Sequence, residues 1–345
     1  MVKYILKRIL YMVLILLVVT TITFFLLHAI PGDPITKMVQ DLPEETRQAY
    51  LRTYGFDRPV LEQYFLYMKQ LLIGNLGQSL RYPGRKVAEI VVNYSPVSAL
   101  VGGIALAIGV VLGLSCGMLA ALNAGRWPDQ AVMLLALLGT TIPTFVIASL
   151  LQYTLSVTWP IFPTTGYSGA QYLVLPVLCM CVGPLATYAR YMRSSMLEVA
   201  SQDYILTAEA KGLSGWSIVW KHMLRNALLP CVTMICVSVA GIFSGSFIVE
   251  SIFSLPGLGR YFISAINDRD YFVVLGLNVV LTGIYTCSIL ISDILLMLLD
   301  PRIRTKSEAF SSPVTPFRLL LLSGFGDRAA STGYRKPKWS RCRCQ

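Results

Sequence analysis

The sequence carries too little charge for a soluble domain. Only 14% of its 345 residues are charged, whereas 55% are hydrophobic, and the mean hydropathy is +0.62. A typical soluble domain carries about 25% charged residues. The composition therefore excludes an ordinary globular protein and indicates a chain that lies in a bilayer.

The chain also lacks the common catalytic and metal-binding motifs. No G-x-x-x-x-G-K-[ST] loop is present, so any ATP hydrolysis must come from another polypeptide. His28 and His222 lack the Asp, Glu or Cys spacing of a metal site or a triad. An intramembrane hydrolase would need a Ser–His or Asp–Asp pair, and none is found. We therefore expect no enzyme activity, no metal and no bound cofactor in this chain.

Cysteine is absent from every loop that we expect to face an oxidising compartment, which argues against a disulfide framework. The C-x-C pair in the tail is a weak metal signal. The eight cysteines lie in predicted spans (Cys116, Cys179, Cys181, Cys231, Cys236, Cys287) or in the C-terminal tail (Cys342, Cys344).

Six apolar segments are each long enough to cross the hydrocarbon core, which takes about 20 helical residues. They predict an all-α integral membrane protein with six transmembrane helices. The first segment exceeds the roughly 7–15 residues of a signal-peptide core and precedes no cleavage site, so we interpret it as a retained span. The segments cover residues 9–30, 97–122, 131–158, 172–192, 230–252 and 273–299.

The distribution of Lys and Arg in the short loops predicts that both termini are cytoplasmic, because these charges resist translocation. The loop after the third span, PIFPTTGYSGAQ, contains neither residue. The basic residues that face the cytoplasm in this interpretation are Lys3, Lys7, Arg8, Arg126, Arg193, Lys211, Lys221 and Arg225.

The net charge of +11 comes largely from the C-terminal tail. After Thr305, eight Lys or Arg stand against Glu308 and Asp327, which gives six of the eleven net charges. We interpret this tail as disordered, either attracted to anionic lipid or without a selected role. The predicted organisation is an N-terminal segment with the first span (1–30), an extracytoplasmic subdomain (31–96), a five-helix core (97–304) with a cytoplasmic loop (193–229), and the tail (305–345).

Within the subdomain, LPEETRQAYLRTYG (42–55) and RPVLEQYFLYMKQLLIG (58–74) have helical periodicity and predict two amphipathic helices. The spans are rich in small residues that allow close helix packing. Ser244, Gly245 and Ser246 either serve such packing or line a pathway. Three prolines are expected to interrupt spans, marking either a pathway or a kink: Pro143, Pro176 and Pro184.

Between the fourth and fifth spans lies DYILTAEAKGLSGWSIVWKHMLRNALLP, residues 203–230, which predicts a helix, a turn and a second helix. Gly212 falls where a helix ends in the left-handed conformation. The second helix is predicted to present one apolar face formed by Trp216, Val219, Trp220 and Met223. This face lies on the bilayer surface, packs on the chain's own spans, or docks a cytoplasmic protein. Small side chains at Ala208 and Ala210 favour docking, because a partner can approach closely.

The same stretch resembles the cytoplasmic EAA loop of ABC importer permeases, in the version of the dipeptide, oligopeptide and nickel branch. Further stretches of that branch follow in order over residues 1–304: HAIPGDP, GNLGQS, FPTTGY, VESIFSLPGLGRYFISAINDRDY and LLDPRIR. The chain departs from the general pattern at Leu206 and in the tail. The matching loop residues are Asp203, Tyr204, Ile205, Thr207, Ala208, Ala210, Lys211, Gly212, Leu213, His222, Leu224, Arg225, Asn226, Ala227, Leu228 and Pro230.

The resemblance implies a multi-pass permease in a bacterial or archaeal plasma (inner) membrane. It would pair with a second homologous permease, dock two cytoplasmic ATPase subunits that use ATP and Mg, and receive peptides or a related solute from an extracytoplasmic solute-binding protein. The segment from Glu250 to Tyr271 would meet that binding protein or form a re-entrant cap. The residues expected to couple to the ATPase are Ala208, Ala210, Lys211, Gly212, Leu213 and Trp216, with Arg225, Asn226 and Pro230 fixing the loop to the fifth span.

One alternative remains open from the sequence. A membrane receptor or scaffold would bind a signalling protein through the same loop and transport nothing. The substrate also stays open among dipeptides, oligopeptides, nickel chelates and related solutes.

Overall fold

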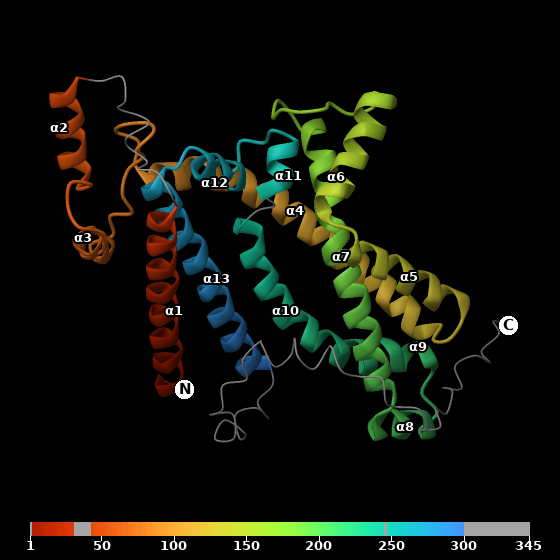
Figure 1. Cartoon of the computed structure of the whole chain (residues 1–345). Helices are drawn as coiled ribbons and strands as arrows, with labels where there is room; N and C mark the ends of the chain where they lie inside the picture. Colours follow the sequence, from red (N-terminus) through yellow and green to blue (C-terminus); the bar gives the residue numbers. More distant parts are fainter. Residues whose placement is uncertain (1, 31–42, 245–246, 300–345) are drawn as a thin grey trace.

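The computed structural model describes residues 2–30, 43–244 and 247–299. Within these ranges the chain is helical and has no β-strand, apart from an isolated antiparallel bridge between Gln78 and Lys86. The predicted all-α class is therefore confirmed for the described part of the chain (Figure 1).

The described residues contain five helical segments that are long and apolar enough to cross a membrane, or six if one bent pair forms a single span. The predicted six spans agree with the second count. The bent pair is α5 (Trp127–Thr141) with α6 (Thr144–Gln152) and the π-helical segment η1 (Tyr153–Thr158). The long helices are α1 (Val2–Ala29), α4 (Val87–Leu122), α7 (Gln171–Ala200), α10 (Leu224–Ser244) and α13 (Tyr271–Leu299).

Proline has two different effects in these helices. At Pro143 the third span bends by 96°, and the preceding Ile142 takes the extended conformation that proline imposes on its neighbour. Pro176 and Pro184, in contrast, lie inside α7 without ending it. The expectation that these two prolines interrupt a helix was wrong. A membrane span can continue through proline, because groups on neighbouring helices can satisfy the backbone carbonyls that proline leaves without a hydrogen bond.

Several boundaries differ from the sequence prediction. Helix α4 begins at Val87, so the second span starts earlier than residue 97. The fifth span was expected at 230–252. The apolar helical segment instead begins at Gly215, passes through Pro230 and ends within α10, whereas Phe247–Ile252 form the separate short helix α11. Much of the predicted loop 193–229 therefore belongs to the ends of long helices.

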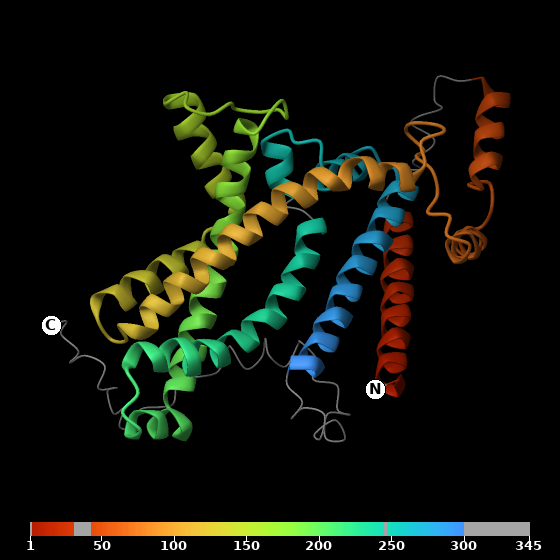
Figure 2. The same cartoon turned by 180° about the vertical axis from the view of Figure 1, so that it is seen from behind.

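Helices α4 and α7 cross at very short distance through a row of glycines (Figure 2). A side chain on Gly109 would place its Cβ 2.8 Å from the Cys181 carbonyl oxygen of α7. One on Gly113 would lie 2.6 Å from the Leu185 oxygen. Glycine is needed here because, in lipid, helices associate by van der Waals contact rather than by the hydrophobic effect.

The short helices gather at the two ends of this bundle (Figure 1). At one end lie α2 (Glu44–Tyr54), α3 (Val60–Leu72), α11 and α12 (Leu258–Asn267), and this end is called the α12 end below. The predicted helices at 42–55 and 58–74 correspond to α2 and α3 and are confirmed. At the other end lie α8 (Asp203–Ala210), α9 (Gly215–Ser217) and the N-terminal residues of α1, and this end is called the α8 end.

An ion pair connects α1 and α13, the first and last described helices, near the α8 end. Arg8 of α1 lies 3.0 Å from a carboxylate oxygen of Asp293 in α13. A core of buried side chains joins α1, α3, α4, α12 and α13 at the α12 end, and it includes Phe24, Tyr67 and Val87. Helices α1 and α13 are thus held together at both ends.

The glycine row gives a testable prediction for the fold. Gly113→Ala should lower the melting temperature of the purified protein in detergent, because overpacking a tight contact costs about 1–3 kcal/mol. Gly103→Ala, in the same helix but with open space around the added Cβ, is the matched control and should not lower it. Equal melting temperatures for the two variants would contradict this packing.

Candidate functional site

The candidate site lies at the α8 end, where α8 packs against the final turns of α7. Ile205 and Ala208 of α8 are buried with Met192 and Met196 of α7. The opposite side of α8 is exposed, including Leu206 at 58%. One side of helix α8 thus packs on the bundle, while its other side is exposed to solvent.

The structure corrects the role expected for Ala208. Its side chain is 5% exposed and belongs to the chain's own core, so it does not offer a surface for direct docking. The reason is the helical repeat, which places Ala208 on the same side as Ile205. Ala210 and Lys211, by contrast, are exposed as expected.

Gly212 ends α8 in the predicted left-handed conformation, with φ of +74°. Its N–H donates to the Glu209 carbonyl at 2.9 Å, and the Leu213 N–H donates to the Ala208 carbonyl at 3.3 Å. These two bonds form a Schellman motif, in which a residue other than glycine is strained. The turn is exposed, and a Cβ added to Gly212 would meet no atom within 4 Å beyond the adjoining residues.

The second helix begins after Ser214, whose hydroxyl accepts from the Ser217 N–H at 3.4 Å. The prediction of a single apolar face was wrong. Val219 and Met223 are buried against α7 and α8, whereas Trp216 and Trp220 are exposed at 67% and 53%. A wider π-helical turn, η2 (Ile218–Met223), replaces the regular helical spacing here.

The two indole rings of Trp216 and Trp220 lie in a stacked arrangement, with centroids 6.4 Å apart. They therefore form one exposed aromatic surface beside the Gly212 turn. We define the coupling surface as the exposed residues Tyr204, Leu206, Ala210, Lys211, Gly212, Leu213, Trp216 and Trp220.

Asn226 connects the two parts of this region. Its side-chain amide nitrogen lies 3.1 Å from the Tyr204 hydroxyl in α8 and 2.8 Å from the His222 carbonyl oxygen. Arg225 and Pro230 are exposed on α10. The structure thus gives Asn226 a contact of the kind expected for it, while the roles of Arg225 and Pro230 stay predictions.

An ion pair between a buried acid and a partly exposed arginine lies near this site and was not predicted from the sequence. Arg193 of α7 forms two hydrogen bonds to the Asp129 carboxylate in α5, one of them at 2.8 Å, and Asp129 is 3% exposed. The Gly125 N–H also donates to Asp129 at 2.9 Å. The available signal was an acid in the first turn of a helix, but nothing in the sequence indicates its distant arginine.

His28 lies far along the chain from the coupling surface and has a structural environment. Its ring stacks on Phe24 at a centroid distance of 4.2 Å, and its nitrogens lie 2.9 Å from the Phe24 carbonyl oxygen and 3.1 Å from the Gln63 amide oxygen. Among the described residues, no group of three or more His, Cys, Asp or Glu is placed to hold a metal.

The suggested pathway residues give less information. Ser244 is the last residue of α10, and Gly245 and Ser246 lie outside the described residues. Their role stays a prediction. The coupling surface itself offers aromatic and aliphatic side chains, one exposed lysine and a fixed turn, which is chemistry suited to binding a protein.

Two protein-family models match the chain. Residues 109–305 match the model described as binding-protein-dependent transport system inner membrane component, and residues 1–83 match the N-terminal model of the same description. Together they cover the coupling surface, α8 and most of the long helices.

Curated relatives extend this match. The chain is 40% identical over 306 residues to the dipeptide transport system permease protein DppB of Bacillus subtilis, covering 88% of this chain and 98% of that protein. It is 38% identical over 307 residues to the oligopeptide transport system permease protein OppB of Haemophilus influenzae, covering 88% and 100%. The chain therefore belongs to the binding-protein-dependent transport system inner membrane component family, as a multi-pass inner-membrane ABC transporter permease that resembles the dipeptide and oligopeptide members.

Proposed function

We propose that this chain forms part of the translocation pathway of an ABC importer for dipeptides, oligopeptides or a related solute. The observation that carries the proposal is the coupling surface, an exposed turn and aromatic pair seated on a buried core at the end of α7. The names of the curated relatives support peptides as the substrate class.

The proposed orientation places the α8 end in the cytoplasm. The N-terminal end of α1 lies at the same end as α8 (Figure 1); α1 begins with Lys3, Lys7 and Arg8, and α8 is followed by Lys211, Lys221 and Arg225. Lys and Arg near span ends favour the cytoplasmic side. This orientation places α2, α3, α11 and α12 on the extracytoplasmic side, where a binding protein would deliver the solute.

In this proposal two cytoplasmic ATPase subunits supply the energy, and a second homologous permease completes the pathway. The chain has no phosphate-binding loop, so ATP and Mg would be used by the partners. An ATPase that holds α8 in a groove would move it as its nucleotide state changes. Because Ile205 and Ala208 pack on Met192 and Met196, α7 would move with α8.

Gly212 allows a sharp test of this coupling. Gly212→Asp should abolish solute uptake at normal expression, because it places a carboxylate in the proposed ATPase contact. The matched control is Gly55→Asp at the end of α2, where the glycine also has φ of +74°, ends a helix with the same pair of hydrogen bonds and has open space around its Cβ.

Both variants carry the same backbone strain, so a general loss of stability would affect them alike. Gly55→Asp should retain uptake measured with radiolabelled peptides in cells. Uptake by Gly212→Asp at the level of Gly55→Asp would show that the turn is not a coupling element.

Partner composition gives a second, independent test. The tagged chain, extracted from its native membrane in mild detergent, should bring with it a second six-span permease and one or two ATPases with phosphate-binding loops, identified by mass spectrometry. Recovery of the chain with a kinase or regulator and no ATPase would instead favour a receptor or scaffold. The Gly212→Asp variant should recover less ATPase than the parent chain.

A further inference from the structure

The extracytoplasmic side carries a rigid hairpin at residues 77–87. The Val87 N–H donates to the Gly77 carbonyl at 3.1 Å, and the Ser79 N–H donates to the Arg85 carbonyl at 2.8 Å. Its tip, Tyr82-Pro83-Gly84-Arg85, is closed by the Arg85 N–H at 3.1 Å from the Tyr82 oxygen. Gly84 has φ of +84°, and Pro followed by such a glycine is typical of a type II turn. The tip therefore holds one backbone geometry.

A buried carboxylate fixes this hairpin to the start of α13. Asp270 is 3% exposed and accepts hydrogen bonds from the Ser79 hydroxyl and from the Leu80 and Arg81 N–H groups, the last two at 3.0 and 3.3 Å. A buried carboxyl group that accepts from several donors holds these partners in place, because each donor lost leaves the buried oxygens less satisfied. The hairpin is thus attached to the helical bundle.

A second buried carboxylate fixes the start of α12. Glu250 of the short helix α11 is 2% exposed and accepts from the Ser98 hydroxyl of α4 at 2.8 Å and from the Arg260 N–H at 3.1 Å. The Leu258 N–H donates to the same Ser98 hydroxyl at 2.9 Å. Burial raises the pKa of the Glu250 carboxyl, and these hydrogen bonds oppose that rise. We call the hairpin at 77–87 together with α12 the outer platform.

The side chains presented by the outer platform are those that dominate protein interfaces. The Arg85 guanidinium lies over the Tyr82 ring, 5.2 Å from its centroid, and one of its nitrogens lies 3.5 Å from the Tyr261 hydroxyl of α12. The Tyr261 ring in turn contacts Tyr94 at a centroid distance of 4.8 Å. Tyrosine and arginine on a fixed backbone are the residues enriched among those that contribute most to binding.

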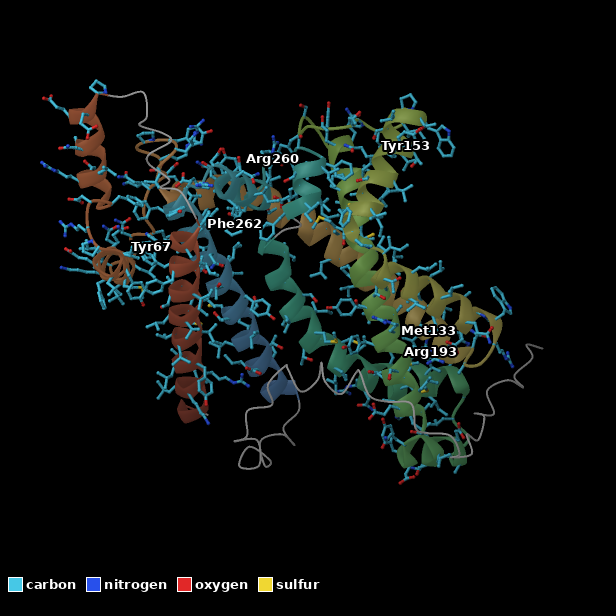
Figure 3. The ribbon with its side chains drawn as sticks, in the orientation of Figure 1. Tyr67, Met133, Tyr153, Arg193, Arg260 and Phe262 are labelled. Carbon is cyan, nitrogen blue, oxygen red and sulfur yellow. The ribbon has the colours of Figure 1, made fainter. Side chains whose placement is uncertain are left out.

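The outer platform is also uniformly basic. Its sequence contains four basic residues and no Asp or Glu; the nearest acids along the chain are Glu89 and Asp268, just outside it. Figure 3 shows Arg260 on α12 at this end of the molecule. In the described part of the chain none of the four makes an ion pair, and all four are exposed: Arg81, Arg85, Lys86 and Arg260.

Resting on the proposed function, we propose that the outer platform is the docking surface for the extracytoplasmic binding protein and that it meets an acidic surface of that protein. Unpaired positive charge attracts a complementary partner and accelerates encounter. The fixed backbone of the outer platform favours a folded protein over a lipid headgroup as its partner. A rigid platform loses little conformational entropy when a protein surface of complementary shape binds. A fluid headgroup layer makes no such demand on shape.

The test uses the permease assembled with its partners in nanodiscs and the ligand-loaded binding protein that stimulates ATP hydrolysis by this complex. Arg85→Glu should weaken binding of that protein, measured by biolayer interferometry, by about tenfold or more. Arg85→Gln should give a smaller loss in the same direction. For the parent, affinity should fall as salt is raised, and Arg85→Glu should reduce this dependence.

Lys69→Glu is the matched control. Lys69 is also an exposed base on the extracytoplasmic side, but it lies in α3 and outside the outer platform. Its reversal should leave the affinity unchanged. ATP hydrolysis without the binding protein should be the same in all variants, which shows that each complex is assembled.

Three outcomes would overturn the proposal. The first is parental affinity of assembled Arg85→Glu, and the second is an equal loss of affinity in Lys69→Glu. The third is a lipid effect: phosphatidylglycerol changes ATP hydrolysis by the parent but not by Arg85→Glu, while the two bind the binding protein with equal affinity. This result would identify a lipid site. A parent chain that assembles with no ATPase would instead reject the proposed function, before any platform variant is compared.

Discussion

The close crossing of α4 and α7 is the contact on which both ends of the molecule depend. Gly109 and Gly113 bring the two backbones together, and no side chain larger than hydrogen fits at these positions without displacing α7. Such a contact leaves no space between the backbones for a change in their separation, because no flexible side chain lies between them. Helices α4 and α7 therefore form one packed unit; α7 leads to the coupling surface and α4 to the outer platform.

At the α8 end, this unit supports the coupling surface through α7. Met192 and Met196 lie beneath Ile205 of α8, and Arg193 between them binds Asp129 of α5. At the other end, the unit supports the outer platform through α4, whose Ser98 hydroxyl contacts both Glu250 and the first N–H of α12. In the proposed function, a displacement of α8 is passed to α12 through these packed helices and the hydrogen-bonded Glu250 carboxyl group. Such a mechanism requires two discrete arrangements of this unit relative to the rest of the transporter.

The sequence predicted the features that depend on neighbouring residues. The helices α2 and α3 follow from apolar periodicity, and the left-handed Gly212 follows from a helix-forming segment that ends at glycine. It failed where tertiary packing changes the local geometry. The π-helical turn at Ile218–Met223 separates Trp216 and Trp220 from Val219, and regular helical spacing gives no sign of it. The contact of Ser98 with Glu250 joins residues 152 positions apart, which no local pattern can indicate.

The buried acids also bear on how the transporter is driven. An ion-driven carrier needs a carboxylate in the membrane that exchanges its partner as the ion binds and leaves. The three acids that are most buried among the described residues are already committed: Asp129 to Arg193, and Glu250 and Asp270 to backbone N–H groups and serine hydroxyls. Separating any of these groups from its hydrogen-bond donors would leave a buried polar group unsatisfied, which costs free energy. Their geometry suits a structural role, because each carboxylate joins two elements of the chain. In the proposed function, energy enters as a mechanical displacement, and the exposed coupling surface around Gly212 is where we propose that a partner applies it.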